Sequence, residues 1–349
     1  MRFYYVFIQD QYGNPVKTFS SAKADGTPDT GALTFEIDAT LTQQALSTDK
    51  ATLTLWGIAP DHSTYRNWAN PITPYTISVY GGMLKGLPLA NPMQQGLLLQ
   101  GAIFQCYTNW IGTAMTLSFV IGSDTGLIAN PKCFYTTWYK QQKLSDFLNA
   151  TLTASKIKKF TVDSLDKDIV PNESKTFRSN GLHNFMADLQ SQTFIAINGV
   201  EPRDNMSYTY NGITSFYRND LLWITDHATE PKNKTGTPKK IEFSDLIGQP
   251  AWVGPVTIQL YLVMRGDLSV LDILTLPETP VTTSAAALSQ YNQIDRNGAA
   301  FQGEFYITEL RHTGNSRSSN ALDWMTIITV TPIMKAQVTP TVTIEALIQ

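Results

Sequence analysis

The longest regular alternation of apolar and polar residues lies in the segment Gly96–Asp124. In its second half an apolar residue occupies every second position, namely Met115, Leu117, Phe119 and Ile121. This is the pattern of a strand with one buried face. The first half, Leu97–Thr108, is apolar on both faces for much of its length, which is typical of a strand inside a sheet. Turn-forming residues lie between the halves, so the segment predicts a long β-hairpin with its turn at Asn109–Gly112.

Shorter stretches with the same two-residue period precede this hairpin. They predict strands at Phe3–Ile8, Leu33–Asp38, Ala51–Ile58 and Thr76–Tyr80, the last of which stops at Gly81 and Gly82. Turn and loop residues separate the first of them at Tyr12–Pro15 and Ser20–Gly31. About six closely spaced strands indicate a small antiparallel barrel or sandwich.

Apolar residues take a helical spacing in the middle of the chain. One helix is predicted over Lys143–Thr153 and a second over Asn180–Ser191. A short strand at Phe194–Ile197 then leads into Asn198–Gly199, a dipeptide that favours a two-residue hairpin turn. The segment His227–Lys240 is basic and contains Pro and Gly, so we expect an exposed loop there.

A second long hairpin is predicted near the C-terminus, where Phe305–Arg311 pairs with Asp323–Val330 around an intervening loop. The chain thus divides into a β domain at residues 1–124, a mixed α/β linking region at 125–240 and a second β domain at 241–349. Both β domains end on a long hairpin, which is a weak internal repeat of element pattern.

The composition indicates a polar surface with few charges. Charged residues make up 16% of the 349 residues and the net charge is −3, which gives no bulk electrostatic reason to bind nucleic acid or an anionic membrane. The apolar start of the chain is too short for a signal peptide, and no run reaches the ~18 apolar residues of a membrane span. Cys106 and Cys133 are expected to be reduced thiols. We therefore expect synthesis in the cytosol and no membrane partner.

The sequence has no nucleophile elbow, phosphate loop, dinucleotide glycine fingerprint or zinc-protease helix motif. Its four histidines stand apart from one another and from the cysteines. Asp267 and Asp272 are near in sequence, but Asp267 falls in a predicted turn, Arg265–Asp267, where a solvated carboxylate is the simpler interpretation than an acid/base pair. We therefore predict that the protein is not an enzyme and needs no metal or cofactor.

A small basic patch and the tryptophans are the remaining candidates for binding. The patch consists of Lys232, Lys234, Lys239 and Lys240, and either a solvated loop or a partner contact would explain it. The seven tryptophans are spread evenly along the chain. Core packing or subunit contacts explain that spread better than a platform for stacking a ligand.

Several segments occur in an order known from one family. In the N-terminal part they are LTFEID (33–38), ATLTLWGI (51–58), ISVYGG (77–82), LLLQGAIFQC (97–106) and MTLSFVIGSD (115–124). Later ones are LSDFLNATL (144–152), the region 241–274 and FYITELRHTGNSRSSNALDWMTIITV (305–330). Together they resemble the central baseplate hub proteins of contractile-tailed bacteriophages. The resemblance covers most of the chain, although Asn315 stands where many members have Asp and residues 227–240 have no counterpart.

The resemblance implies a mainly β fold with an α+β insert, in which two tail-tube-like antiparallel β-barrel domains flank a mixed linking region. It implies a homotrimer whose six barrels form a pseudo-sixfold ring. That ring would join the hexameric tail-tube protein to the trimeric spike protein, beside other baseplate proteins, and genomic DNA would pass through the lumen without specific binding. The protein would be a structural virion component of the tail baseplate, assembled in the host cytoplasm.

On this hypothesis, ring or partner contacts are expected at Asn109, Trp110, Lys232, Lys234, His312 and Arg317. Two alternatives in the same class stay open, a tail-tip or distal tail protein of a non-contractile phage and the hub of a phage-derived injection machine. A third, from another class, is a glycan-binding or glycan-cleaving β protein. It would need two carboxylates facing each other across a cleft at roughly 5–10 Å.

Overall fold

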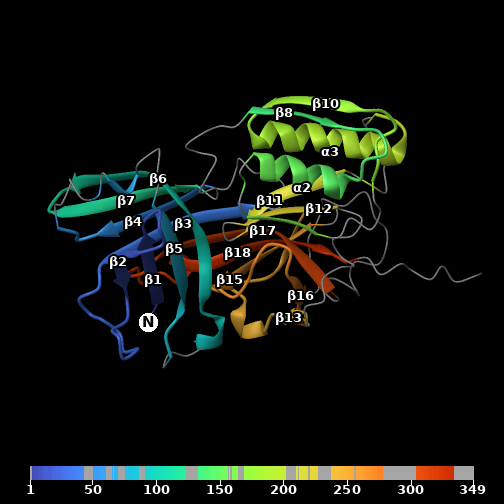
Figure 1. Ribbon diagram of the computed structural model, residues 1–349. Coiled ribbons are helices and arrows are strands. Elements are labelled where there is room, and N and C mark those ends of the chain that lie inside the picture. Colours follow the sequence, from blue (N-terminus) through green and yellow to red (C-terminus); the bar gives the residue numbers. More distant parts are fainter. Residues whose placement is uncertain are drawn as a thin grey trace, which may run out of the picture.

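The structure is a computed structural model. It describes residues 2–42, 50–59, 65, 67–69, 75–85, 91–122, 133–155, 157, 159–163, 169–201, 210, 212–218, 221–226, 237–254, 257–277 and 304–333. Within these ranges most strands belong to one 13-stranded sheet. Two small sheets and two helices form a separate unit beside it (Figure 1). This confirms the mainly β fold class with an α/β insert.

The elements fall into three consecutive groups. The first β part contains β1 (Arg2–Gln9), β2 (Pro15–Ser20), β3 (Thr34–Thr42), β4 (Lys50–Trp56), β5 (Thr76–Met83), the 3-10 helix η1 (Pro92–Gln94), β6 (Gly96–Ile111) and β7 (Ala114–Gly122). The insert contains β8 (Cys133–Trp138), α2 (Leu144–Ala154), β9 (Phe160–Val162), β10 (Lys175–Asn180), α3 (Leu182–Asn198), β11 (Ile213–Arg218) and β12 (Leu221–Asp226). The second β part contains β13 (Lys239–Lys240), η2 (Phe243–Asp245), β14 (Ala251–Gly254), β15 (Thr257–Val263), β16 (Ile273–Thr275), β17 (Glu304–Asn315), η3 (Ala321–Asp323) and β18 (Trp324–Pro332).

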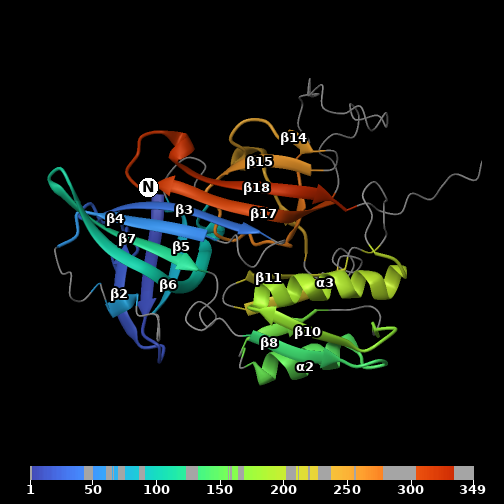
Figure 2. The same cartoon turned by 90° about the horizontal axis from the view of Figure 1, so that it is seen from above.

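The two β parts share one continuous sheet. Its strand order is β14-β15-β18-β17-β3-β4-β7-β6-β5-β1-β2, and β13 and β16 attach at the side of β17. The junction is the antiparallel pair β17 and β3, in which His312 lies opposite Ala39 and Thr313 opposite Asp38. Figure 2 shows the long strands of both parts running side by side across this junction.

The two-residue period of the sequence decides which face of this sheet is buried. In β3, Phe35, Ile37 and Ala39 are buried, and the alternating residues Glu36 and Asp38 are on the other face. The same phase continues in the neighbouring strands because residues paired across an antiparallel ladder lie on one face. One face of the sheet is therefore apolar and covered, and the other is polar.

Residues from the end of the chain complete the core of the first β part. This core contains the buried residues of β1, β3, β4, β5, β6 and β7, together with Met264 and Trp324 from the second β part. The Trp324 indole is 2% exposed, packs edge-on against Phe35 with ring centroids 6.0 Å apart, and donates from Nε1 to the carbonyl oxygen of Gly82 at 2.9 Å. Removing such a side chain costs about 3–5 kcal/mol, so the first part depends on the second.

The insert is a separate three-layer unit. Its outermost layer is the β8–β10 pair, its middle layer is α2 and α3, and its third layer of β11, β12 and β9 lies nearest the main sheet (Figure 1). Aromatic side chains hold the layers together, among them Phe134 stacked on Phe185 with ring centroids 4.6 Å apart. Phe216 and Trp223 carry the contact to the core of the second β part.

Both predicted hairpins are confirmed, but one turn lies elsewhere than predicted. β6 continues through Asn109 and Trp110 to Ile111, which pairs with Ala114, so the turn is at Gly112–Thr113. Gly112 has a left-handed φ of 61°, which supplies the tight reversal. Similarly, β5 does not stop at its glycine pair but continues to Met83.

The predicted short strand at Phe194–Ile197 and its hairpin turn are wrong. These residues form the last turns of α3, and Gly199 is the helix C-cap with φ 72°. A left-handed glycine suits either a hairpin turn or the end of a helix, and here the continuous apolar face of α3 decides between them.

Candidate assembly surface

Eight strands of the large sheet form an unbroken antiparallel row, in the order β14-β15-β18-β17-β3-β4-β7-β6. At one end of the row, β14 pairs only with β15 among the described strands. At the other end, β5 pairs with β6 only over Gly96–Ala102. Within the described part of the chain, residues Phe104–Ile111 of β6 therefore have a strand on one side and none on the other. We call this segment the β6 free edge.

A β-bulge separates the β6 free edge from the paired part of the strand. The register between β6 and β7 shifts between Ile103 and Gln105, so Phe104 is the extra residue. A bulge bends its strand and increases the local twist, which directs the hairpin past the end of the core (Figure 2). The bend, together with the sixteen-residue length of β6, leaves its last residues beyond the part of the strand that pairs with β5.

Large apolar side chains follow the β6 free edge. Phe104 is 54% exposed, Tyr107 50%, Trp110 72% and Ile111 49%. The register with β7 places Trp110 on one face of the strand and Tyr107 and Ile111 on the other, so exposed apolar side chains lie on both faces of this segment. Exposed large apolar side chains grouped in this way mark interaction sites. An unpaired strand edge is also a template for another strand, because its backbone N–H and C=O groups lack partners. The apolar side chains and the open backbone edge together make this segment the candidate assembly surface.

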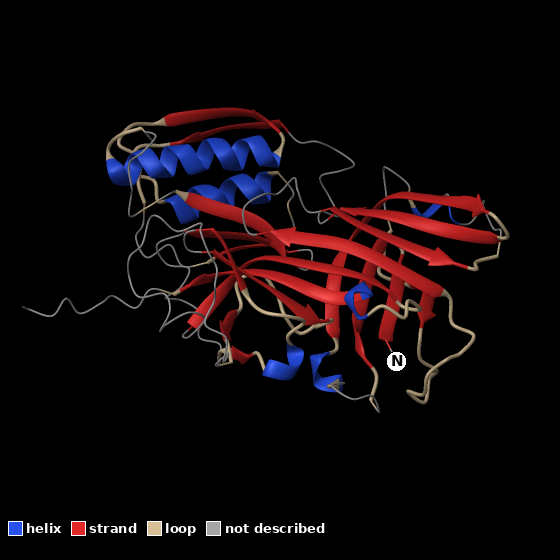
Figure 3. Cartoon of the chain, turned by 180° about the vertical axis from the view of Figure 1, so that it is seen from behind, coloured by secondary structure: helices blue, strands red, loops and turns tan. Residues whose placement is uncertain are grey.

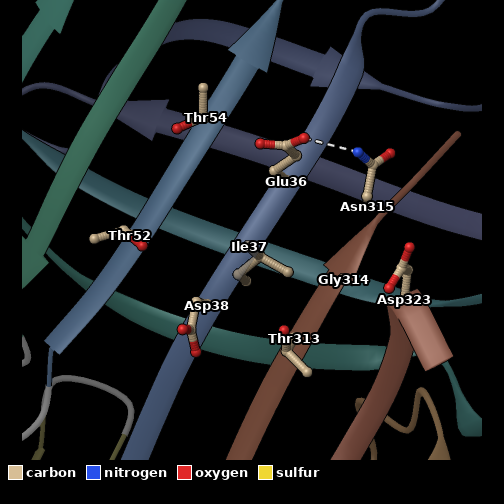
Figure 4. A pocket seen from close by; sticks show the side chains of 9 residues that line it. All are labelled: Glu36, Ile37, Asp38, Thr52, Thr54, Thr313, Gly314, Asn315 and Asp323. Carbon is tan, nitrogen blue, oxygen red and sulfur yellow. Dashed lines mark hydrogen bonds between the residues drawn. The ribbon is translucent and has the colours of Figure 1, made fainter. Parts of the chain in front are cut away.

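The polar face of the sheet carries a shallow groove of about 410 Å³ over β3, β4 and β17 (Figure 4). Its lining consists of Glu36, Ile37, Asp38, Thr52, Thr54, Thr313, Gly314, Asn315 and Asp323. Three of these residues are acidic. Their carboxylates all accept hydrogen bonds from the chain itself.

Cross-strand pairs neutralise or satisfy the acidic groups of this groove. Arg311 donates two hydrogen bonds to Asp38, at 2.8 and 2.7 Å, and these bonds to the carboxylate raise the pKa of the arginine. Asn315 donates to Glu36 at 2.7 Å, and the hydroxyl of Ser318 donates to Asp323. The groove is therefore a hydroxyl-rich surface whose carboxylates are all hydrogen-bonded. Arg311 balances the charge of Asp38, whereas Glu36 and Asp323 are bonded by the neutral groups of Asn315 and Ser318.

A polar seam lies on the buried side of the sheet, between the two apolar cores. His312 is fully buried, and its Nδ1 lies 3.0 Å from the hydroxyl of Thr326. Thr326 also accepts from the backbone N–H of Arg265 at 2.9 Å. Burial lowers the pKa of His312 to about 3, because the charged ring would lose its hydration. His312 is therefore neutral, and its Nε2 has no hydrogen-bond partner among the described residues.

The Arg265 guanidinium continues this seam toward the ends of the strands. It is 4% exposed and bonds Asp267 through Nε and Nη2 at 3.0 and 2.7 Å and Asp245 through Nη1 at 2.9 Å. Burial by itself would lower the pKa of Arg265, but Asp267 and Asp245 together raise it. Asp245 in turn accepts from the Gln94 side chain of the first β part at 2.8 Å. The predicted solvated turn at Arg265–Asp267 is thus wrong, because this turn is a largely buried ion-pair network.

Asp272, the other acid of that sequence pair, is also engaged, since it accepts from Lys239 at 2.8 Å and from the backbone of Ser269 at 2.8 Å. Lys239 also donates to the backbone carbonyl of Asp267. Lys239 and Lys240 begin the second β part as β13, so the predicted exposed loop ends before them. No local pattern indicates these long-range partners, because Lys239 and Asp272 are more than thirty positions apart.

The six residues predicted as contacts have different surroundings. Asn109 and Trp110 lie exposed near the tip of the β6–β7 hairpin, where the Asn109 side chain accepts from the N–H of Trp110 at 2.9 Å. Arg317 is exposed and donates to the carbonyls of Thr30 and Ala32. His312 is enclosed by its own chain, so it offers no exposed side chain to a partner. Lys232 and Lys234 lie outside the described residues.

Three exposed residues, Phe104, Tyr107 and Ile111, were not among the predicted contacts. Phe104 and Tyr107 belong to Leu97–Thr108, which was predicted to lie inside the sheet, and Ile111 belongs to the predicted turn Asn109–Gly112. That interpretation holds for Gly96–Ala102 only. Among the described residues no cluster of three or more His, Cys, Asp or Glu side chains could hold a metal ion, and no described helix has the length and hydropathy to span a membrane.

Comparison with known proteins supports the fold. No protein-family model and no curated protein matches the sequence. A 43 kDa tail protein of prophage MuSo2 from Shewanella oneidensis is similar in structure, with a TM-score of 0.50 at 9% identity over 94% of this chain and 98% of the other. A tail protein from Neisseria meningitidis MC58 has a TM-score of 0.48 at 8% sequence identity, over 94% of this chain and 96% of the other. A chain of a Francisella PdpA-VgrG complex has a TM-score of 0.46 at 9% identity, over 96% of this chain and 54% of the other. The chain thus has the fold of a solved phage tail protein.

Proposed function

We propose that the protein is a structural ring component of a phage tail baseplate. In this proposal three copies close into a pseudo-sixfold ring that joins the hexameric tail tube to the trimeric spike. The chain has no catalytic role and needs no cofactor. The fold shared with a prophage tail protein supports the class of machine. The observation that carries the ring is the run of eight antiparallel strands from β14 to β6, in which, among the described residues, β14 and residues 104–111 of β6 each pair with one strand only.

The number of strands in this row is what makes ring closure simple. Neighbouring strands alternate in direction, so the first and last strands of an eight-stranded row run in opposite directions. A rotation about an axis parallel to the strands leaves the direction of every strand unchanged. When such a rotation places a second copy beside the first, β14 of the second copy is antiparallel to β6 of the first. The alternation then continues from copy to copy. Such a head-to-tail contact closes into a ring when the rotation matches the number of copies.

The polar face of the sheet suits the lining of a passage for DNA. Arg311, a cation on this face, is paired with Asp38, and threonine hydroxyls line much of the groove. Phosphate-binding proteins instead present free Lys and Arg side chains to the backbone. A hydroxyl-rich wall whose cation is already paired, and whose Glu36 and Asp323 are bonded by neutral groups, gives a polyanion no site to bind, which is what rapid passage requires.

The first test of this function is the mass of the protein in solution, measured by light scattering after gel filtration, alone and with the tube and spike proteins encoded beside it. We expect three times the mass of one chain. Trp110→Asp places a charge at the β6 free edge and is expected to weaken assembly at least tenfold, because buried tryptophans at an interface contribute about 2 kcal/mol or more. Tyr139→Asp is the matched control, since Tyr139 is 63% exposed but lies on the insert.

A wild-type chain that stays monomeric under all these conditions would refute the ring. Equal masses for wild type and Trp110→Asp would refute the role of the β6 free edge but leave a ring of another geometry. The presence of a sheath and a separate spike in the same particle distinguishes a contractile baseplate from a non-contractile tail tip.

A further inference from the structure

The β8–β10 pair presents a face of aromatic, hydroxyl and amide side chains to solvent. Figure 3 shows this pair as the outermost layer of the insert, with α2 and α3 between it and the large sheet. Residues that pair across an antiparallel ladder lie on the same face of a sheet. Three such pairs make up the outer face: Cys133 with Asn180, Tyr135 with Arg178, and Thr137 with Thr176. We call these six residues the outer insert face.

The other residues of the two strands fix the orientation of the outer insert face. Phe134, Trp138 and Phe177 are buried in the core of the insert. Ser179, on the same side as these three, donates to Asp188 of α3 at 2.6 Å. Because side chains alternate along a strand, this packing holds the remaining positions toward solvent. The outer insert face is therefore rigidly presented without being covered by the chain itself.

Tyr135 and Arg178 form the centre of the outer insert face. The Arg178 guanidinium lies over the Tyr135 ring, 5.3 Å from its centroid, and Tyr135 is nevertheless 72% exposed. No ion pair joins Arg178 to an acidic side chain among the described residues. The planar guanidinium can therefore donate two parallel hydrogen bonds to an incoming carboxylate or phosphate.

Uncharged polar groups lie on either side of this centre. The hydroxyls of Thr137 and Thr176 are 3.0 Å apart across the two strands and lie on the exposed side. The Asn180 side chain accepts from the Cys133 thiol at 3.7 Å, and its amide nitrogen has no partner among the described residues. Hydroxyl and amide groups both donate and accept hydrogen bonds, which is what the hydroxyls of a sugar require.

We propose that the outer insert face binds a carbohydrate chain that carries carboxylate or phosphate groups. The C–H groups of a sugar ring pack against the face of an aromatic ring, which is electron-rich, and Tyr135 supplies such a ring. Thr137, Thr176 and Asn180 exchange hydrogen bonds with the sugar hydroxyls. The acidic substituent binds Arg178, the one cation of this face. This site lies on the insert and does not depend on the proposed ring.

Two other occupants suit the outer insert face less well. The buried centre of a protein–protein interface is usually apolar, and none of the six residues is aliphatic. Duplex DNA is held by several free cations along its backbone, whereas Arg178 is the single cation among the six. Single-stranded DNA also stacks on aromatic rings, so it serves as a comparison ligand in the binding test.

Isothermal titration calorimetry with hexagalacturonate, which bears carboxylates, and with a phosphate-bearing mannan fragment tests the site. We expect saturable binding of one or both, and binding of the neutral maltohexaose that is about tenfold or more weaker, because hydrogen bonds to a charged group contribute about 1.5–3 kcal/mol. Tyr135→Ala and Arg178→Gln should each weaken binding of the acidic glycan by a similar factor. Tyr12→Ala is the matched control, since Tyr12 is 79% exposed but precedes β2.

Three results would overturn the proposal. They are no binding of either acidic glycan, unchanged binding by Arg178→Gln, and tighter binding of polyglutamate or oligothymidylate than of the glycans. Polyglutamate carries carboxylates without sugar rings, and oligothymidylate carries phosphates with bases that stack. Preference for one of these two would show that charge alone, or a nucleic acid, occupies the face.

The thiol of Cys133 reports where the glycan binds. Cys133 is exposed and belongs to the outer insert face, so the bound glycan should slow its alkylation by iodoacetamide severalfold at saturation. Binding without protection of Cys133 would place the glycan elsewhere and refute the site. Tyr135→Ala should leave the mass of the assembly in solution unchanged, so failure of this site and failure of the ring are read from different measurements.

Discussion

Replacing His312 tests whether a neutral histidine lies in the seam between the cores. The folded chain holds the pKa of His312 near 3, whereas the ordinary value is 6.5. Below about pH 6.5 the unfolded chain therefore binds a proton that the folded chain does not. The free energy of unfolding then falls as the pH falls, by about 1.4 kcal/mol per pH unit until the folded value is reached.

The expected magnitude follows from these two pKa values. Between about pH 7 and about pH 5, His312 alone should lower the free energy of unfolding by about 2 kcal/mol. That is a large share of a total stability of roughly 5–15 kcal/mol. His312→Gln keeps a hydrogen-bonding group near Thr326 but cannot titrate, so its stability should lose about 2 kcal/mol less over the same pH range.

Urea unfolding of both proteins at matched concentration, followed by fluorescence at several pH values, measures this difference. Carboxylates elsewhere also change stability with pH, but they contribute equally to both proteins and cancel in the comparison. His183→Gln is the matched control, since His183 is exposed on α3 and its replacement leaves the seam unchanged. If the free energies of unfolding of wild type and His312→Gln change in parallel with pH, the His312 imidazole is protonated or otherwise hydrogen-bonded in the folded state. That result would refute the reasoning.

Three further predictions concern the seam and the thiols. Arg265→Met leaves Asp245 and Asp267 without their cation and should lower the free energy of unfolding in urea by about 3–5 kcal/mol. Arg311→Met on the exposed face should lower it by under about 1 kcal/mol. Equal losses in the two variants would contradict the buried network. Gly96→Ala should lower the free energy of unfolding by more than about 2 kcal/mol, because its Cβ would overlap the Gly266 backbone. Gly31→Ala should change it little. An unchanged free energy for Gly96→Ala would show that the two backbones are farther apart. Burial raises the pKa of Cys106 to about 12, whereas Cys133 is exposed. At about pH 8 iodoacetamide should therefore modify Cys133 first, which mass spectrometry measures. Faster labelling of Cys106 would contradict its burial.

Local sequence patterns were sufficient to predict most of the strands and the two helices. The alternation of Leu53 and Leu55 with threonines predicts a strand with its leucines inward, and both leucines are fully buried. The dipeptide Asn198–Gly199 misled because its glycine satisfies a helix C-cap as well as a turn. The alternating pattern was sufficient to predict the strand. A left-handed glycine occurs both in hairpin turns and at helix ends, so only packing decides between the two.

Contacts between distant segments could not be predicted in this way. The pairing of β3 with β17 joins residues 267 to 279 positions apart, and alternation carries no information about which strands become neighbours. The network around Arg265 shows the same limit, because Asp267 is two residues away, whereas Asp245, and the Gln94 side chain that bonds Asp245, lie on other elements. The candidate surface was found only in part for the same reason, since the open side of β6 depends on where β5 ends.

The position of Trp324 has a consequence for the order of synthesis. Its indole fills the core of the first β part, yet a ribosome releases it only after more than nine tenths of the chain. Until then the early strands lack this cover, and the backbone of Phe35 lacks the Ser316 hydroxyl that it bonds at 2.9 Å. A prematurely terminated chain therefore cannot finish its first barrel-like part. Such a product would present no correctly shaped edge to full-length copies, and the ring would be built from complete chains alone.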